Sequence, residues 1–234
     1  MNPEDPPLPP DPELLNRQPK WFKPVFYGCI VASILFVLSG LTAPVVLRSA
    51  KKSTQTQATA NLRQIGIALL EFDTDFGAFP SDKTKDLVDK KHPGHGFNLS
   101  GKSSNAQFRR LFAAKLTQSE AMFYAKVKGT RRPDGNISPG EALKKGEVGF
   151  GYIAGLSTEG NPARVIAFCP IIPGTDRFDP KPFDGRAVIL RIDNSVTSVN
   201  IDKHGHAIVG GINLLSPANP IWGVGDKIDI RYPE

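Results

Sequence analysis

The residues of this chain that could carry out metal or catalytic chemistry are few. Two residues separate His92 from His95 and one separates His204 from His206, so either pair could place both imidazoles on one metal ion. Both pairs lie in glycine-containing turns, and no cysteine or acidic cluster completes a ligand set around them. We therefore interpret all four as solvated loop histidines and predict no metal site from them.

The sequence also contains no motif for nucleophilic catalysis or phosphate binding. Cys169 follows an apolar, strand-like run and precedes a proline, where a thiol normally packs, and the chain contains no Gly-x-Ser-x-Gly motif. The segment Gly101-Lys102-Ser103 lacks the upstream glycine and the preceding strand of a phosphate-binding loop. Because Cys29 lies in a long apolar run far from Cys169, we expect two free thiols. The sequence predicts that the protein is not an enzyme.

The length and composition are those expected for one modest soluble domain plus an anchor. The chain has 234 residues, of which 40% are hydrophobic and 22% charged. The formal net charge is +6, but the basic residues are interleaved with acidic ones, and no nucleic-acid motif is present. We predict no nucleic-acid partner.

The segment Val25 to Leu47 contains no charged residue and is followed by Arg48, Lys51 and Lys52. At 1.5 Å per residue a helix of this length would cross the roughly 30 Å core of a bilayer. A cleaved signal peptide has a shorter apolar core and a small-residue cleavage site, so we predict an uncleaved transmembrane helix over 25–47. The proline-rich residues 1–24 are predicted to be a disordered tail. Charge does not decide the orientation, because each side of the span carries three basic residues.

The periodicity over residues 48–80 predicts that the helix continues beyond the membrane as an amphipathic helix. Apolar residues recur at alternating steps of four and three, which places them on one stripe that needs a packing partner. Gly77 and Pro80 predict the end of the helix. We call the following set the packing stripe: Ala58, Leu62, Ile65, Leu69, Phe72 and Phe76.

Residues 81–234 are predicted to form an α+β globular domain. We expect a loop over 81–104, a broken helical region over 105–128 that restarts at a Thr117–Glu120 capping box, and an irregular segment after residue 213. Between them, short β-branched runs separated by turn residues predict an antiparallel sheet. Its clearest element is a hairpin with Asp193 and Asn194 as a two-residue turn. The predicted fold class is α+β, with a long transmembrane-plus-amphipathic N-terminal helix packed on a small antiparallel sheet.

Three segments together resemble type IV pilin-like proteins, and most closely the major pseudopilins of type II secretion of the planctomycete and verrucomicrobial kind. These segments are Ala43-Pro44 with the basic residues after it, Asn61-Leu-Arg-Gln-Ile-Gly66 with Phe76-Gly-Ala-Phe-Pro80, and the hairpin Gly185–Val196. Residues 81–148 do not take part in the resemblance. The prepilin cleavage motif is not kept, since Phe22, Lys23 and Tyr27 stand where the family has Gly, Phe and Glu.

The resemblance implies a single-span protein of the bacterial inner membrane, with a cytoplasmic N-terminus and an extracytoplasmic domain. It implies a structural role in protein secretion or a pilus-type system, through packing against other pilin-like subunits or secretion components. Major pseudopilins often bind calcium, and the nearest candidate oxygen ligands here are Asp176, Asp179 and Asp184. Their spacing is not that of an EF-hand, so we expect no cofactor and keep calcium as an alternative. The alternative function is a membrane-tethered extracytoplasmic domain that binds a ligand on its own.

Overall fold

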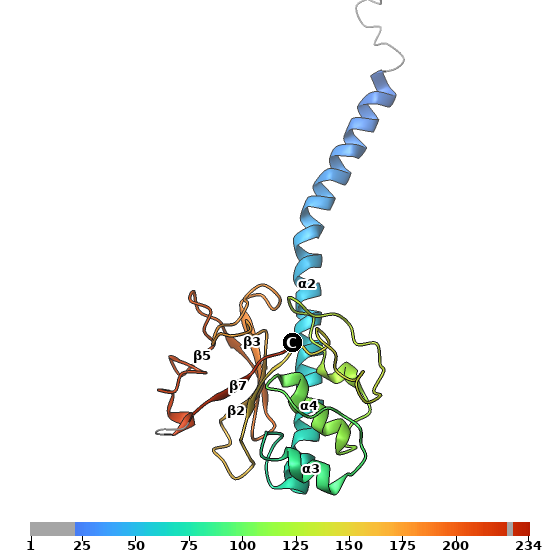
Figure 1. The fold of residues 1–234 in the computed structure, drawn as a ribbon. Helices are drawn as coiled ribbons and strands as arrows, with labels where there is room; N and C mark the ends of the chain where they lie inside the picture. The colour runs from blue at the N-terminus through green and yellow to red at the C-terminus, as the bar shows by residue number, and fades with distance from the viewer. Residues whose placement is uncertain (1–21, 224–226) are drawn as a thin grey trace, which may run out of the picture. The chain divides into compact units, whose positions relative to one another are not determined.

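The computed structural model describes residues 22–223 and 227–234. Within these ranges, the side chains of residues 22, 23, 26 and 34–48 lie outside the description. The predicted proline-rich tail therefore falls almost entirely outside the described residues, and so do many side chains of the predicted span. The chain divides into two compact units, Met1–Leu47 and Arg48–Glu234. Mixed helices and an antiparallel sheet place the fold in the α+β class (Figure 1).

The long helix α2 runs from Phe22 to Phe76. In the first unit its described apolar side chains are exposed, among them Val25, Tyr27 and Val31. In the second unit it ends at the predicted position. There the backbone N–H of Gly77, at a φ of +73°, donates to the Asp73 carbonyl over 2.7 Å. A left-handed residue at this position is a common helix cap, and glycine adopts it without strain.

Five antiparallel strands form the main sheet in the order β4-β3-β2-β1-β7. Strands β1 (Gly151–Ala154), β2 (Val165–Cys169), β3 (Arg186–Arg191) and β4 (Val196–Asn200) follow one another along the chain, and β7 (Asp229–Arg231) returns beside β1. Strands β5 (Ile208–Val209) and β6 (Ile212–Asn213) form a separate two-stranded ribbon.

Both faces of the sheet are covered, so alternate residues of one strand enter two different cores. In β3, Val188 and Leu190 join the core that contains the packing stripe of α2, whereas Ala187 and Ile189 join a second core with Trp222. We name these the helix-side core and the outer core. Strands buried on both faces are continuous apolar runs, which explains why the sequence of β2 and β3 shows little polar alternation.

Three short helices lie outside the sheet: α3 (Lys85–Lys91), α4 (Ser104–Ala113) and the 3₁₀ helix η1 (Glu120–Phe123). A second 3₁₀ turn, η2 (Pro220–Trp222), places the Trp222 indole in the outer core, where its N–H donates to the Leu214 carbonyl over 2.8 Å.

Several sequence predictions of local structure were wrong. The predicted loop over 81–104 contains α3, the predicted strand 206–212 is split into β5 and β6, and the segment after residue 213 supplies β7. The Thr117–Glu120 capping box does not form. Instead, Ser119 precedes η1 without a side-chain cap, and the Glu120 carboxylate accepts backbone N–H bonds from Gly135 and Leu143. The side-chain cap that does form is at Ser103, whose hydroxyl accepts from the Ala106 N–H of α4.

The predicted two-residue turn at Asp193-Asn194 is a three-residue loop. The N–H of Asn194 donates to the Arg191 carbonyl, and Arg191 in turn donates to the Ser195 carbonyl, each over 3.0 Å. Only Asn194 has a positive φ, +63°, whereas a two-residue turn of this kind requires two such residues. The Asp193 carboxylate instead accepts from the Ser195 N–H over 2.9 Å. A turn followed by one left-handed residue is the usual geometry of three-residue hairpin loops.

Candidate interaction site along helix α2

The packing stripe is the set of predicted site residues that the structure brings together most completely. Ala58, Leu62, Ile65, Leu69 and Phe72 are each 0% exposed, and Phe76 is partly buried against the same helix-side core. Fully burying one large apolar side chain contributes about 1.5–3 kcal/mol. The stripe therefore accounts for a large part of the free energy that holds α2 to the rest of the second unit.

The packing stripe contacts two groups of residues that are far apart in the sequence. One set is the helix-facing side of the sheet, including Tyr152, Ile166 and Leu190. The other is the segment around α4 and η1, where the rings of Phe108 and Phe123 lie 4.9 Å apart between centroids. In the second unit, the buried face of α2 is thus covered jointly by the sheet and by the segment around α4 and η1 (Figure 1).

Asn61 links the start of the buried stripe to η1. Its side-chain amide donates to the backbone carbonyls of Ala121 over 3.0 Å and Tyr124 over 2.7 Å. One polar helix residue therefore binds both ends of a segment 60 residues later in the chain. Hydrogen bonds from one side chain to two backbone carbonyls fix the position of a loop that has little regular structure of its own.

Gly66 lies directly under the tip of the β3–β4 hairpin. A Cβ added to Gly66 would lie 3.0 Å from Leu190 Cδ1 and well inside contact distance of Asn194 Oδ1. That oxygen is buried and has no hydrogen-bond partner among the described residues. The absence of a side chain at Gly66 thus allows the hairpin tip to reach the helix backbone. The two segments that carried the family resemblance, Asn61–Gly66 and the hairpin, meet at this point.

The segment directly after α2 is hydrogen-bonded to strand β1 and to the loop that follows β1. The Tyr152 hydroxyl donates to the Pro80 carbonyl over 2.8 Å, and the Phe79 N–H donates to the Leu156 carbonyl over 3.0 Å. Complete burial raises the pKa of the Tyr152 phenol well above its usual value, so this donor stays protonated. The Asp73 carboxylate accepts from the hydroxyl and the N–H of Thr158.

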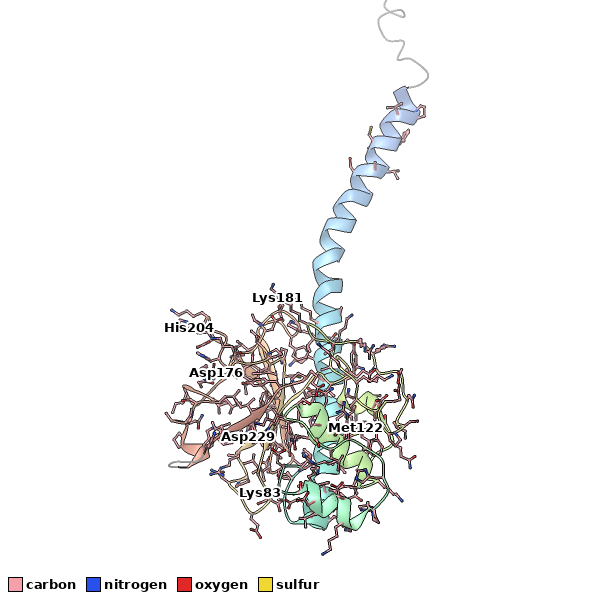
Figure 2. All side chains as sticks on the ribbon, viewed as in Figure 1. Lys83, Met122, Asp176, Lys181, His204 and Asp229 are labelled. Carbon is pink, nitrogen blue, oxygen red and sulfur yellow. The ribbon has the colours of Figure 1, made fainter. Side chains whose placement is uncertain are left out.

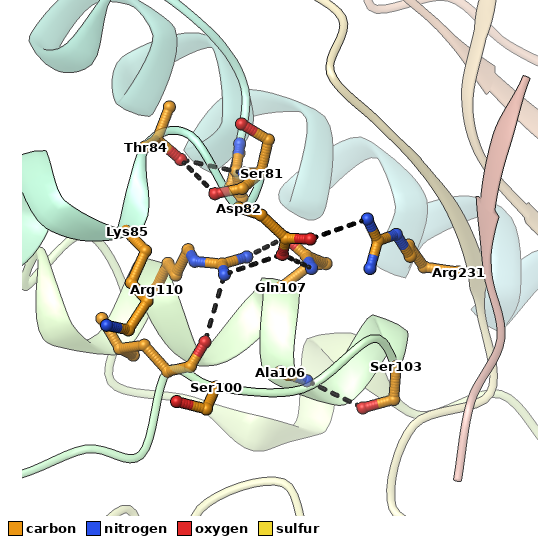
Figure 3. Close-up of polar contacts among 12 residues, drawn as sticks. Ser81, Asp82, Thr84, Lys85, Ser100, Ser103, Ala106, Gln107, Arg110 and Arg231 are labelled. Carbon is orange, nitrogen blue, oxygen red and sulfur yellow. Dashed lines mark hydrogen bonds and ion pairs between the residues drawn. The ribbon is translucent and has the colours of Figure 1, made fainter. Parts of the chain in front are cut away.

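A charged cluster connects the α3–α4 region with β7 (Figure 3). The Asp82 carboxylate lies 3.0 Å from Nη2 of Arg231 and 3.4 Å from Nη2 of Arg110, which is itself 1% exposed. Partial burial alone would raise the pKa of Asp82. Hydrogen bonds from Arg231 and Gln107 and the charges of both arginines outweigh this effect, so the pKa is lowered. Sequence reasoning missed this cluster, because its members are scattered between residues 82 and 231.

The three calcium candidates do not converge on one point. The Asp176 carboxylate accepts from the Asn213 side chain, Asp179 accepts from the Lys181 N–H, and Asp184 lies 3.8 Å from the Lys51 ammonium. Within the described residues, no three His, Cys, Asp or Glu side chains form a group that could hold a metal ion. Each aspartate therefore has a different partner: Asp179 accepts within its own turn, Asp176 contacts a distant asparagine, and Asp184 faces a lysine of α2.

The two histidine pairs have different surroundings: the rings of His204 and His206 lie 6.4 Å apart between centroids, whereas His95 contacts Asp89. The backbone N–H of Phe97 donates to His95 Nδ1 over 2.9 Å, which leaves the Nε2 proton to donate to Asp89 over 2.8 Å. His206 lies 3.6 Å from Asp176 and 3.7 Å from Asp202 (Figure 2 labels His204 and Asp176 in this region). Cys169 is buried in the helix-side core, and burial raises the pKa of its thiol well above the usual value, which makes it a poor nucleophile.

Comparisons with models of known families, with characterised proteins and with solved structures found no match for the chain. Within the part of the chain that the structure describes, none of the helices is both long enough and apolar enough to cross a membrane.

Proposed function

We propose that the chain is a membrane-anchored, pilin-like structural protein that acts by helix packing rather than by catalysis. The proposal rests on the different burial of the two faces of α2 in the second unit. One face of the helix is buried in the helix-side core, with the hairpin tip on Gly66, while the opposite face stays exposed. Four exposed residues lie along this face at intervals of about two helical turns: Ser53, Ala60, Ile67 and Thr74.

The exposed face is suited to a second helix. Ile67 is 59% exposed although it lies between buried residues of the same helix, and Ser53 and Ala60 have small side chains. Small residues let helix backbones approach closely, and an exposed isoleucine at the centre provides apolar contact area. Neighbouring copies, or other pilin-like components of a secretion or pilus-type system, are the partners that such a surface fits.

The anchor in this proposal rests on the uncharged sequence run from Val25 to Leu47 and the basic residues that follow it. With the family-like topology, the N-terminus is cytoplasmic, residues 25–47 cross the inner membrane, and the second unit is extracytoplasmic. Because Phe22, Lys23 and Tyr27 replace the family's cleavage-site residues, the proposal is for a permanently anchored protein.

Disulfide cross-linking in native membranes tests the assembly. Single cysteines at Ser33 and Gly40 are introduced in a Cys29→Ser background, since buried Cys169 does not react. Lys203→Cys, an exposed position in the Asp202–His206 turn outside α2, is the matched control. Because each variant has one reactive thiol, we expect disulfide-linked dimers from each α2 position, above the level given by the control. A variant with cysteines at both Ser33 and Gly40 should extend these dimers into ladders. Monomer alone at all three positions would refute the assembly.

The second candidate is a membrane-tethered domain that binds a ligand on its own. The observation that favours it is an open groove on the second unit, lined in part by residues 126–129 and 170–173, which α2 does not fill. A chain that stays monomeric in the cross-linking experiment, yet retains a partner through this groove, would support the second candidate over the first.

A further inference from the structure

An open groove lies between two loops of the second unit, formed by residues 126–131 and 170–182. Its first part encloses about 870 Å³ and is floored by Val127, Ile171, Ile172 and Pro173. A neighbouring hollow of about 560 Å³ shares Val127, Gly129, Ile171 and Pro173 with it and continues past Val148 to Pro233. The shared lining makes one continuous, largely apolar trough, which we call the basic groove.

The rim of the groove is positively charged. Lys126 and Lys128 lie on one side, Lys181 on the other, and Lys145 at the far end; Figure 2 labels Lys181. Among the described residues, none of these four ammonium groups has an ion-pair partner, in contrast with Lys144, which pairs with Glu141 and Asp134.

The acidic groups in the groove are already engaged. The Asp179 carboxylate accepts from the backbone N–H of Lys181 over 2.9 Å, and the Glu234 carboxylate binds the Ser103 hydroxyl. Arg131, which also lines the trough, pairs with Glu147 over 3.1 Å. The four lysines therefore outnumber the two carboxylate side chains of the lining, Asp179 and Glu234, and the groove keeps a net positive charge.

The walls of the groove are held by backbone bonds. Arg131 donates to the Gly146 carbonyl over 2.8 Å, and the Thr130 hydroxyl donates to the carbonyls of Ala125 and Val127. On the opposite wall, Ile172 donates to the Arg177 carbonyl over 2.8 Å. Ile172 is nevertheless 41% exposed, so a large apolar side chain stays uncovered between fixed walls. A preformed site of this kind loses little conformational entropy on binding.

We propose that the basic groove binds an extended, acidic segment of a partner polypeptide. Apolar side chains of the segment would cover Val127, Ile171 and Ile172, and its carboxylates would pair with the lysines of the rim. Stacking of single-stranded nucleic acid needs aromatic side chains, and none lines the trough. The groove lies outside the packing stripe and its exposed opposite face, so this inference does not depend on helix assembly.

The test uses the full chain, purified in detergent micelles and immobilised, against a displayed library of random 12-residue peptides. Peptides that are recovered are then measured by fluorescence anisotropy with the wild type and with a Lys126→Glu/Lys128→Glu/Lys181→Glu variant. A Lys52→Glu/Lys83→Glu/Lys115→Glu variant is the control, because it changes the net charge equally at exposed lysines that do not line the groove. Circular dichroism verifies that both variants are folded.

We expect the recovered peptides to combine Asp or Glu with apolar residues, and to bind the groove variant about tenfold or more weakly than the control variant. Hydrogen exchange of residues 126–131 and 170–182 should slow when such a peptide is bound. The inference is overturned if no peptide is recovered, or if the peptides bind both variants equally. It is also overturned if phosphatidylglycerol vesicles alone show the groove-dependent binding, because the occupant would then be a lipid surface.

Discussion

Replacing Gly66 by alanine should destabilise the second unit, although alanine is the better helix former. In an exposed helix the change would contribute about 0.8–1.0 kcal/mol of stability. Here the new Cβ would overlap Asn194 Oδ1 and press on Leu190 Cδ1 at 3.0 Å. Overpacking a well-filled site costs about 1–3 kcal/mol. Taking the middle of that range, about 2 kcal/mol, less the propensity gain of about 0.9 kcal/mol, we expect a net loss of about 1 kcal/mol for Gly66→Ala.

A double-mutant cycle with Asn194→Gly isolates the contact. Glycine accepts the φ of +63° at this position, so the loop is retained while the obstructing side chain is removed. In that background Gly66→Ala should become neutral or stabilising by about 0.5 kcal/mol, which gives a coupling energy of about 1–1.5 kcal/mol. Ala60→Gly, at an exposed position of the same helix, is the control and should cost about 1 kcal/mol in both backgrounds.

The assay is urea unfolding of a fragment beginning at Arg48, followed by near- and far-ultraviolet circular dichroism. Both cores lie wholly within this unit, so the fragment retains every buried contact that the prediction uses. In a thermal scan each kcal/mol should shift the Tm by about 2–4 °C. The reasoning is refuted if the two substitutions add within about 0.5 kcal/mol, or if Gly66→Ala raises the stability of the wild type.

Three further substitutions test other parts of the fold. Leu69→Asp places a carboxylate in the helix-side core and should cost at least 3 kcal/mol in urea unfolding, so an unchanged midpoint would contradict the packing of the stripe. Asp82→Asn should cost about 1 kcal/mol of stability near pH 7. The cost is no larger because the carboxylate is half exposed and solvent screens its charge. Because the pKa of folded Asp82 is lowered, the contribution of its charge is present above the unfolded pKa of about 4 and is lost as the pH falls through the folded pKa. The wild type and Asp82→Asn should therefore converge in acid, and a difference that grows in acid would contradict the assignment. Trp222→Phe removes the indole donor to Leu214 and should cost about 1 kcal/mol or more by the same assay, whereas no change would contradict the role of this bond in the outer core.

The features that could be predicted from the sequence are those encoded by local periodicity. The packing stripe repeats over five turns, so the buried face of α2 is visible without knowledge of its partner. The strands β2 and β3 are apolar, β-branched runs bounded by turn residues. Strand β2 lies within the predicted strand 163–169, and β3 overlaps the predicted strand 187–192 but begins one residue earlier. The end of α2 is equally local, because Gly77 and Pro80 determine it within four residues.

The remaining features depend on contacts between distant segments. Helix α3 has seven residues and only one buried apolar side chain, Val88, which is too little to give a helical period. Strand β7 exists because Asp229–Arg231 pairs with β1 and Arg231 reaches Asp82, and neither partner is near it in sequence. The sequence places Glu120 in a helix capping box, but its carboxylate accepts hydrogen bonds from the backbone N–H groups of Gly135 and Leu143 instead.

The candidate site likewise has one part that local periodicity predicts and another that depends on contacts between distant segments. The stripe was predicted residue by residue, but its contact with Asn194 was not, because only the three-dimensional register brings the hairpin loop over Gly66. The three-residue loop also escaped prediction, since Asp193 and Asn194 both tolerate a positive φ and only the pairing of Arg191 with Ser195 decides which one adopts it. The basic groove is assembled from loops about 40 residues apart in the chain, and no local pattern distinguishes their lysines from other surface lysines.

The missing side chain at Gly66 also determines where along α2 the sheet can dock. Gly66 is the sole glycine between Arg48 and Phe76. A slide of the sheet by one helical turn, about 5.4 Å, would bring Leu62 or Leu70 under the hairpin tip, and either leucine would collide with it. The helix and the sheet can therefore associate at one axial position only. A load applied along α2 would be resisted by steric overlap at this residue in both directions, and not by apolar burial alone.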